Sequence, residues 1–162
     1  LLTTERLRIV PLTPRQLWLW LHDIPALENE LDAAAQPEAR AATPPDRRVQ
    51  RVAALAAADP GNHLFHTFWF LVIRDGGAGS ACFKGTADAN GKVEIGYGLE
   101  KAFEKQGYMT EAVRALCAWA QQQPGVRQIT AETDPDNRAS QRVLQKAGFH
   151  PAEADATRWW SL

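Results

Sequence analysis

The stretch that decides the fold is VEIGYGLEKAFEKQGYMTEAVRALCAWA, residues 93–120. Its first seven residues predict a strand, and from Met109 onward apolar residues recur at helical spacing. The segment between them is rich in lysine, glutamine and glycine. Such a strand–loop–helix junction directs backbone N–H groups and the positive end of the helix dipole at one point, which favours a bound phosphate. The alternative is a solvent-exposed loop before a core helix, because these junctions are common.

Two glycines, Gly96 and Gly98, interrupt the expected strand over 93–99. Glycine weakens a strand and often marks a bulge. A bulge here would splay this strand away from the one expected over 127–133 and leave a slot lined with unpaired N–H and C=O groups. An extended amide-bearing ligand could pair with those groups as an additional strand. The alternative is a bend that holds no ligand.

A second informative stretch is ITAETDPDNRASQRVLQKAGF, residues 129–149. It predicts a strand, a turn and a helix that begins near Asn137. Asn137 and Ser140 lie one helical turn apart and therefore share a face. The alternative is that Asn137 only caps the helix and Ser140 only fills its first turn.

The rest of the chain surrounds these two stretches with further strands and helices. Thr13 and Pro14 open a helix, with Gln16 completing a capping box. The strands are expected at 4–10, 65–74 and 80–85, the further helix at 46–58, a turn at 75–77 and a final hairpin at 149–162. A meander followed by β-α-β-α requires a parallel pair with a right-handed crossover. The class is therefore α/β, mixed around one sheet.

The two stretches, in this order, resemble the GCN5-related N-acetyltransferase (GNAT) superfamily. Its phosphate loop, Gln/Arg-x-x-Gly-x-Gly/Ala, aligns with Glu104, Gly107 and Met109, so that the central glycine matches and the outer positions depart. Similarity to the branch that acetylates ribosomal-protein N-termini extends over residues 4–9, 108–112 and 137–149.

The resemblance implies a GNAT-like fold in a single acetyltransferase domain over residues 1–162. The expected sheet is central, mostly antiparallel and six to seven strands wide, with a splayed strand pair and a β-α-β-α C-terminal half. The implied co-substrate is acetyl-CoA. The implied acceptor is a primary amine, either a protein N-terminus or a small molecule.

The resemblance also assigns site residues. The pantetheine arm would lie along Gly98 and Leu99, Asn137 would hydrogen-bond the arm, and Ser140 would approach the thioester sulfur. The pyrophosphate would bind the backbone amides of Lys105, Gln106, Gly107, Tyr108, Met109 and Thr110.

Amine acetylation needs a proton acceptor, because a protonated amine cannot attack a thioester. Glu94, two residues before Gly96, is the candidate base, directly or through water, and Glu132 is the second candidate. Glu94 can alternatively serve only to pair with a neighbouring strand. A backbone N–H near 97–99 would stabilise the oxyanion.

The departing thiolate needs an O–H donor. Many relatives supply a tyrosine at the position aligned with Leu144, so Ser140 is the candidate here, and Tyr108 is expected to pack at the helix start. Trp159 and Trp160 are candidates for a wall of the acceptor pocket, with one of the two facing the core.

Composition excludes several other classes. Lys plus Arg number 18 and Asp plus Glu 19, so bulk electrostatics do not predict nucleic-acid binding. The longest apolar run, 68–73, is far too short to span a membrane. Two cysteines and no secretory leader favour a cytoplasmic protein. His63 and His66 lack a third ligand, so we expect no metal. A monomer or homodimer is expected.

Two alternatives to the enzyme remain at this point. The departures at Glu104, Met109 and Leu144 would suit a non-catalytic domain that binds and senses an acyl-CoA. A phosphate-ligand α/β enzyme of another type would bind a nucleotide without the pantetheine arm equally well.

Overall fold

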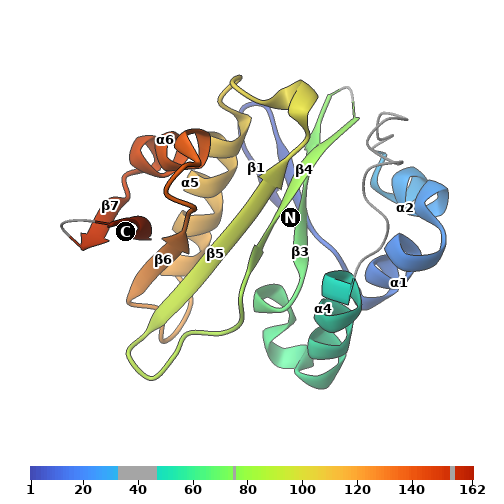
Figure 1. Cartoon of the computed structure of the whole chain (residues 1–162). Coiled ribbons are helices and arrows are strands. Elements are labelled where there is room, and N and C mark those ends of the chain that lie inside the picture. The colour runs from blue at the N-terminus through green and yellow to red at the C-terminus, as the bar shows by residue number, and fades with distance from the viewer. Residues whose placement is uncertain (33–46, 75, 154–155) are drawn as a thin grey trace.

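The computed structural model describes residues 1–32, 47–74, 76–153 and 156–162. Its eight strands form one sheet in the order β1-β2-β3-β4-β5-β6-β8-β7 (Figure 1). The strands are β1 (Leu2–Thr3), β2 (Arg8–Pro11), β3 (Phe68–Ile73), β4 (Gly76–Phe83), β5 (Lys92–Leu99), β6 (Gln128–Glu132), β7 (His150–Glu153) and β8 (Ala156–Ser161). Among these strands β5 and β6 are parallel and the other neighbours antiparallel. The expected α/β class and mostly antiparallel sheet are confirmed.

The sheet is one strand wider than the six to seven expected, because β1 (Leu2–Thr3) precedes the first expected strand, 4–10. The backbone N–H of Thr4 donates to the carbonyl of Leu7 at 2.9 Å, which closes a turn. This turn takes up the first residues of the predicted strand, so the strand β2 begins only at Arg8, and β1 pairs with it.

The helices follow the predicted order with one addition. They are α1 (Pro14–His22), α2 (Ile24–Leu31), α4 (Arg47–Ala58), α5 (Tyr108–Gln121) and α6 (Arg138–Ala147), with short 3-10 turns η1 (Pro60–Phe65) and η2 (Lys101–Phe103). The capping box of α1 is confirmed by both of its hydrogen bonds. Helix α2 was not predicted. The first residues of the predicted helix 46–58 and turn 75–77 lie outside the described residues.

Helices cover both faces of the sheet (Figure 1). Helices α5 and α6 pack on one face, here called the α5 face, over a core that includes Ile95, Leu116 and Ile129. Helices α1, α2 and α4 pack on the other, here called the α4 face. There the ring centroid of Trp20 lies 5.0 Å from that of Phe68 and 4.6 Å from that of Phe70. The fold is therefore a three-layer α-β-α arrangement.

Strands β5 and β6 separate in the middle of the sheet, as expected for a splayed pair. Their register runs from Lys92↔Gln128 to Glu94↔Thr130, and beyond this point β5 continues to Leu99 paired only with β4 in the sheet order (Figure 1). The predicted splay is confirmed, and it lies at the predicted strands.

The predicted bulge in β5 is wrong. The β4–β5 register is unbroken from Phe83↔Ile95 to Gly79↔Leu99, and the register shift lies one strand away, between β3 and β4. Strands β4 and β5 approach closely at Gly79, where a Cβ would stand 2.3 Å from the Gly98 carbonyl oxygen. The register shift thus lies between β3 and β4, and the pairing of β4 with β5 is regular.

Candidate active site

The open edge of β5 presents backbone groups toward β6. The Lys84 N–H donates to the Glu94 carbonyl at 2.9 Å, and the Glu100 N–H donates to the Ala78 carbonyl at 2.8 Å. Because alternate residues of a strand face the same neighbour, residues 94, 96, 98 and 100 bond to β4. Tyr97 and Leu99 therefore point their N–H and C=O groups into the splay, past the last β5–β6 pair. Gly98 faces β4 through its backbone and open space where its side chain would be.

The loop after β5 forms an anion cradle at the start of α5. Lys105 has φ +62° and Gly107 has φ +83°, so left-handed residues flank Gln106. Such alternation turns successive N–H groups toward one side and makes a nest for an anion. The first N–H groups of a helix have no partner within it, and the N-cap, Gly107, has no side chain to occupy them. The predicted amides of 105–110 are thus brought together at one helix start.

Arg6, whose role was not predicted from the sequence, contacts this loop and the first turn of α5. Its Nη1 donates to the Gln106 carbonyl at 2.8 Å, its Nε donates to Glu111 at 2.7 Å, and its guanidinium stacks 4.5 Å from the Tyr108 ring centroid. The peptide unit is planar and trans, so its C=O and N–H point in opposite directions. A Gln106 carbonyl held toward Arg6 therefore directs the Gly107 N–H into the cradle.

Glu111, in the first turn of α5, is the carboxylate partner of Arg6. Burial by itself raises the pKa of Glu111, but hydrogen bonds from Thr4 and Arg6 outweigh it, so the pKa lies below its ordinary value. The carboxylate therefore stays ionised at neutral pH. Arg6 and Glu111 line a cavity of about 620 Å³, and Arg114 and Lys146 also line it.

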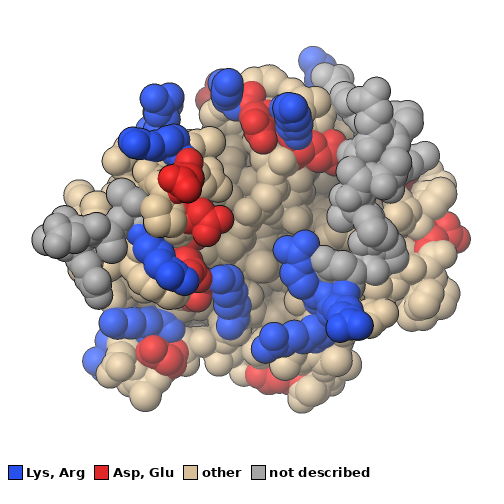
Figure 2. Space-filling view, in the orientation of Figure 1, with Lys and Arg blue, Asp and Glu red and all other residues tan. Residues whose placement is uncertain are grey.

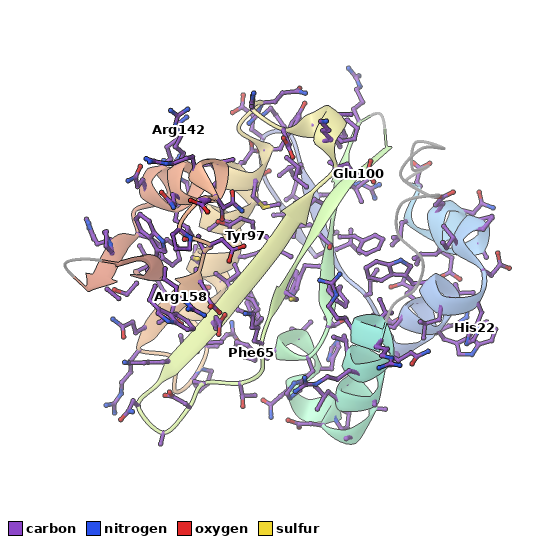
Figure 3. The ribbon with its side chains drawn as sticks, viewed as in Figure 1. His22, Phe65, Tyr97, Glu100, Arg142 and Arg158 are labelled. Atoms are coloured by element: carbon purple, nitrogen blue, oxygen red, sulfur yellow. The ribbon has the colours of Figure 1, made fainter. Side chains whose placement is uncertain are left out.

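The start of α6 faces the slot from the other side. The Asn137 side chain caps the helix by accepting from the Ser140 N–H at 3.1 Å. The Ser140 hydroxyl lies 2.8 Å from the hydroxyl of Tyr97, which extends from β5 toward α6 (Figure 3). Burial raises the pKa of Tyr97, while its bond to Ser140 lowers it in part. Leu144 is buried.

Tyr97 was missed as a site residue. The sequence signal for it was its place between Gly96 and Gly98, on a strand that had already been assigned to the slot. Strand alternation puts it on the α5 face with Ile95, where it reaches α6. The structure thus adds a phenol beside Ser140.

Glu94 lies at the closed end of the splay, on the α4 face. It forms an ion pair with Lys84 and belongs to the last β5–β6 register pair, opposite Thr130. The expected pairing with a neighbouring strand is thus present. Glu94 also lines a cavity of about 460 Å³, together with Lys92 and Trp159. The carboxylate therefore faces a space that a small acceptor group could enter.

The second candidate base, Glu132, lies on β6 and is bound by Arg158 at 3.0 Å. The adjacent tryptophans divide as predicted. Trp160 is 1% exposed and its Nε1 donates to Thr133, whereas Trp159 is 36% exposed and lines the cavity beside Glu94. Figure 2 shows the α4 face hollowed in the middle, with acidic and basic side chains around the hollow.

The described residues contain no group of three or more His, Cys, Asp or Glu side chains placed to hold a metal ion. Across the same described ranges, every helix is too short or too polar to cross a membrane.

The sequence model of one family, described as "Acetyltransferase (GNAT) domain", matches residues 6–150. The chain belongs to this GNAT family. The expected family is therefore confirmed, and the matched range includes the cradle, the splay and the start of α6. Arg6 is the first residue of the match.

Among curated GNAT relatives, the uncharacterized N-acetyltransferase YjdG of Bacillus subtilis (strain 168) is 40% identical over 86 residues, which cover 50% of this chain and 49% of that protein. The chain thus spans about half the length of this curated relative. The chain is therefore similar in sequence to a protein that is named as an N-acetyltransferase.

Two solved structures share the GNAT fold of the chain. RimL, a ribosomal L7/L12 alpha-N-protein acetyltransferase in complex with coenzyme A, aligns with a TM-score of 0.64 and 17% identity, covering 99% of this chain and 96% of its own. The microcin C7 self-immunity acetyltransferase MccE, in complex with acetyl-CoA and AMP, has a TM-score of 0.63 and 17% identity, covering 98% and 93%. At this identity the likeness establishes the fold.

Proposed function

We propose that residues 1–162 form one acetyltransferase domain that transfers an acetyl group from acetyl-CoA to a primary amine by direct attack. The observation that carries the proposal is the geometry of the splay. Strand β5 is in register with β6 only as far as Glu94, and the loop that follows β5 holds Lys105 and Gly107 in the left-handed conformation at the start of α5. Family membership supports the same activity.

The chain can hold the two halves of acetyl-CoA with different groups. The amides of residues 105–110 would bind the pyrophosphate, as helix N-termini do. The backbone of Tyr97 and Leu99 would pair with the amides of the pantetheine arm, beside Gly98. The Asn137 side chain uses its oxygen as the helix cap, which leaves its NH2 group available to the arm.

The reacting groups have candidates on both strands. Glu94 would take the proton of the attacking amine, directly or through water, and Glu132 is the second candidate. A slot-facing N–H of Tyr97 or Leu99 would stabilise the oxyanion. Ser140 would donate to the sulfur as the thiolate departs.

The acceptor is a protein N-terminus or a small amine. The name of the structural neighbour RimL supports the first class, since it is described as acting on an α-N position of L7/L12. The size of the cavity beside Glu94 and Trp159 is compatible with both. A panel containing an L7/L12 N-terminal peptide and free small amines would distinguish them.

Calorimetry with the purified protein tests the proposal. We expect acetyl-CoA to bind in the micromolar range and much more tightly than ADP, because ADP shares the pyrophosphate but lacks the pantetheine arm. Equal binding of the two ligands, or no binding, would contradict the acetyltransferase proposal.

A second measurement tests catalysis. Glu94→Gln and Ser140→Ala should keep most of the affinity for acetyl-CoA but lose turnover on any acceptor that the wild type uses. If the wild type binds acetyl-CoA and acetylates nothing in the panel, the chain is instead a non-catalytic acyl-CoA-binding domain, which is the alternative left by the departures at Glu104 and Met109.

A further inference from the structure

We propose that Tyr97 acts through Ser140 as a positioning residue that aims the serine hydroxyl at the departing thiolate of coenzyme A. This inference rests on the proposed function and extends it to a residue on β5. It assigns the hydrogen-bond support of the leaving group to a pair that spans the splay, one member from each side.

The geometry places this pair in the slot. The Tyr97 hydroxyl lies 2.8 Å from Ser140 Oγ and 3.3 Å from the Ser140 carbonyl oxygen. Tyr97 follows Glu94, the last β5 residue in register with β6, by three positions. The phenol therefore extends from β5 to α6 where the two strands have already separated (Figure 3).

The hydrogen-bond inventory of serine explains what the contact does. A serine hydroxyl has one proton to donate and can accept two. When the phenol donates to Ser140 Oγ, the serine proton must point elsewhere. The backbone N–H of Ser140 is already bonded to Asn137, which fixes the residue at the helix start. The serine proton is then available to a sulfur in the slot.

The phenol stays a donor over the useful pH range. Burial raises the pKa of Tyr97, and the neighbouring Cys117 thiol of α5 acts in the same direction. Burial raises the pKa of Cys117 itself to about 12, so this thiol is uncharged. Arg142 of α6 points away from β5 (Figure 3), and Glu132 of β6 is bound to Arg158. On β5 itself, Glu94 is paired with Lys84, and Glu100, three residues after Tyr97, follows the end of the strand.

The chemistry is hydrogen bonding without net proton transfer through the pair. As the C–S bond breaks, its electron pair remains on sulfur, and Ser140 donates its hydrogen bond to that thiolate while Tyr97 donates to Ser140. Each hydroxyl keeps its own proton. The thiolate later takes a proton from water, and the hydroxide so formed is neutralised by the proton that the amine gave to Glu94, so the products are the amide and the free thiol.

The test compares two probes, coenzyme A and desulfo-coenzyme A, which lacks the sulfur. Their dissociation constants are measured by calorimetry between about pH 6.5 and 10, a range that extends above the cysteine thiol pKa of about 8.5. A site that stabilises the thiolate lowers the pKa of the bound thiol. Coenzyme A should then bind progressively more tightly than desulfo-coenzyme A as the pH rises from the pKa of the bound thiol toward that of the free thiol. Protein groups that do not sense the sulfur cancel in the ratio.

Three variants locate the effect. Ser140→Ala removes the hydrogen bond to the charged sulfur and should abolish the pH-dependent gain, roughly tenfold in the ratio of dissociation constants. Tyr97→Phe keeps the ring in the core and should remove most of that gain, because the serine hydroxyl is no longer oriented. The double variant should match Ser140→Ala alone, because Tyr97 acts only through the serine.

The outcomes separate this inference from the proposed function. If coenzyme A does not bind the wild type, both fail. If it binds without pH-dependent gain, or if Tyr97→Phe weakens both probes equally, the acetyltransferase proposal survives but the pairing proposal is overturned. Additive effects in the double variant would also overturn it, because they would show a packing role for Tyr97.

Discussion

Two glutamates near the cradle, Glu100 and Glu111, experience opposite environments. Burial raises the pKa of Glu100, which directly follows β5, whereas hydrogen bonds from Thr4 and Arg6 outweigh burial and lower the pKa of Glu111. A carboxylate with a lowered pKa stabilises the fold above its unfolded pKa and loses this effect as the pH falls through its folded pKa. A carboxylate with a raised pKa does the opposite.

The two substitutions should therefore change stability with opposite sign. At pH 7, Glu111→Gln should lower the melting temperature and Glu100→Gln should raise it. Both effects should shrink as the pH falls below the unfolded glutamate pKa of about 4.3, and the effect of Glu111 should persist to lower pH because its folded pKa is lowered. Thermal melts of the three proteins at pH 7 and at acidic pH check this. Shifts of the same sign at pH 7 would contradict it.

Gly79 shows how one missing side chain allows two strands to approach. A Cβ there would lie 2.3 Å from the Gly98 carbonyl oxygen and 2.9 Å from the Leu99 Cα, both of them backbone atoms that cannot move aside alone. Gly77, two residues earlier on β4, has open space at the same position.

Gly79→Ala should destabilise the protein by about 1–3 kcal/mol, which is typical of overpacking, and should weaken acetyl-CoA binding because it displaces residues 98–99. Gly77→Ala is the matched control and should change stability little. Urea unfolding measures the first effect and calorimetry the second. Equal unfolding free energies for the two variants would refute the steric argument.

Single residues were predictable where the chemistry is local. The Thr13 cap and the burial of one member of the pair Trp159 and Trp160 follow from spacing alone, and the structure confirms them. Arg6 and Tyr97 were not predictable in this way. Their partners, Glu111 and Ser140, lie 105 and 43 positions away, and only tertiary folding brings them together.

At the scale of elements, the start of α5 is held by a strand segment from the other end of the chain. Arg6 precedes β2 and binds both the loop carbonyl of Gln106 and the first-turn carboxylate of Glu111. The cradle is therefore preorganised before any ligand arrives, and its shape depends on the docking of the N-terminal segment.

Arg6→Ala should weaken acetyl-CoA binding about five- to tenfold, as expected for losing hydrogen bonds that involve charged groups. Binding of S-acetyl-pantetheine, which has no pyrophosphate, should be unchanged. Arg8→Ala is the matched control, since Arg8 also donates to a backbone carbonyl, that of Leu31, but does not touch the loop. Equal losses for both ligands would show that Arg6 supports the fold generally and not the cradle.

Element type was predictable from periodicity, and element detail was not. The order of strands and helices around residues 93–149 is confirmed, since each element carries its own periodic pattern. Helix α2 was missed because eight residues with a proline give a weak pattern, although Asp23 caps it. The glycines of β5 predict a bulge in that strand, but the register shift lies in the β3–β4 pair, and β4 and β5 approach closely at Gly79.

At the scale of the whole molecule, the splay leaves a gap between β5 and β6 in the middle of the sheet. The three register pairs from Lys92↔Gln128 to Glu94↔Thr130 join β5 to β6, and beyond them Tyr97 and Leu99 face the gap. An extended ligand that pairs there would act as a missing strand and connect the two halves of the sheet.

Hydrogen exchange can measure this directly. Without ligand, the amides of Tyr97 and Leu99 should exchange faster than those of Gly96 and Gly98, which bond to β4. Saturating acetyl-CoA should slow the first two and leave the second two nearly unchanged. The unfolding free energy should also rise, by about 2.7 kcal/mol at a ligand concentration 100 times the dissociation constant. If all four amides exchange equally slowly in the free protein, the slot is closed by the chain itself.

The two outer strands of the sheet give this arrangement a further consequence. At one rim β1 has two residues, and at the other β7 carries Pro151, which has no N–H to donate. Long, regular edge strands allow other chains to pair with them and aggregate, whereas short edge strands or edge strands with a proline disfavour such pairing. The accessible hydrogen-bonding backbone of Tyr97 and Leu99 lies instead in the interior of the sheet, on the central strand β5. The domain can thus keep strand backbone open for a small extended molecule while its periphery resists polymerisation in a crowded cell.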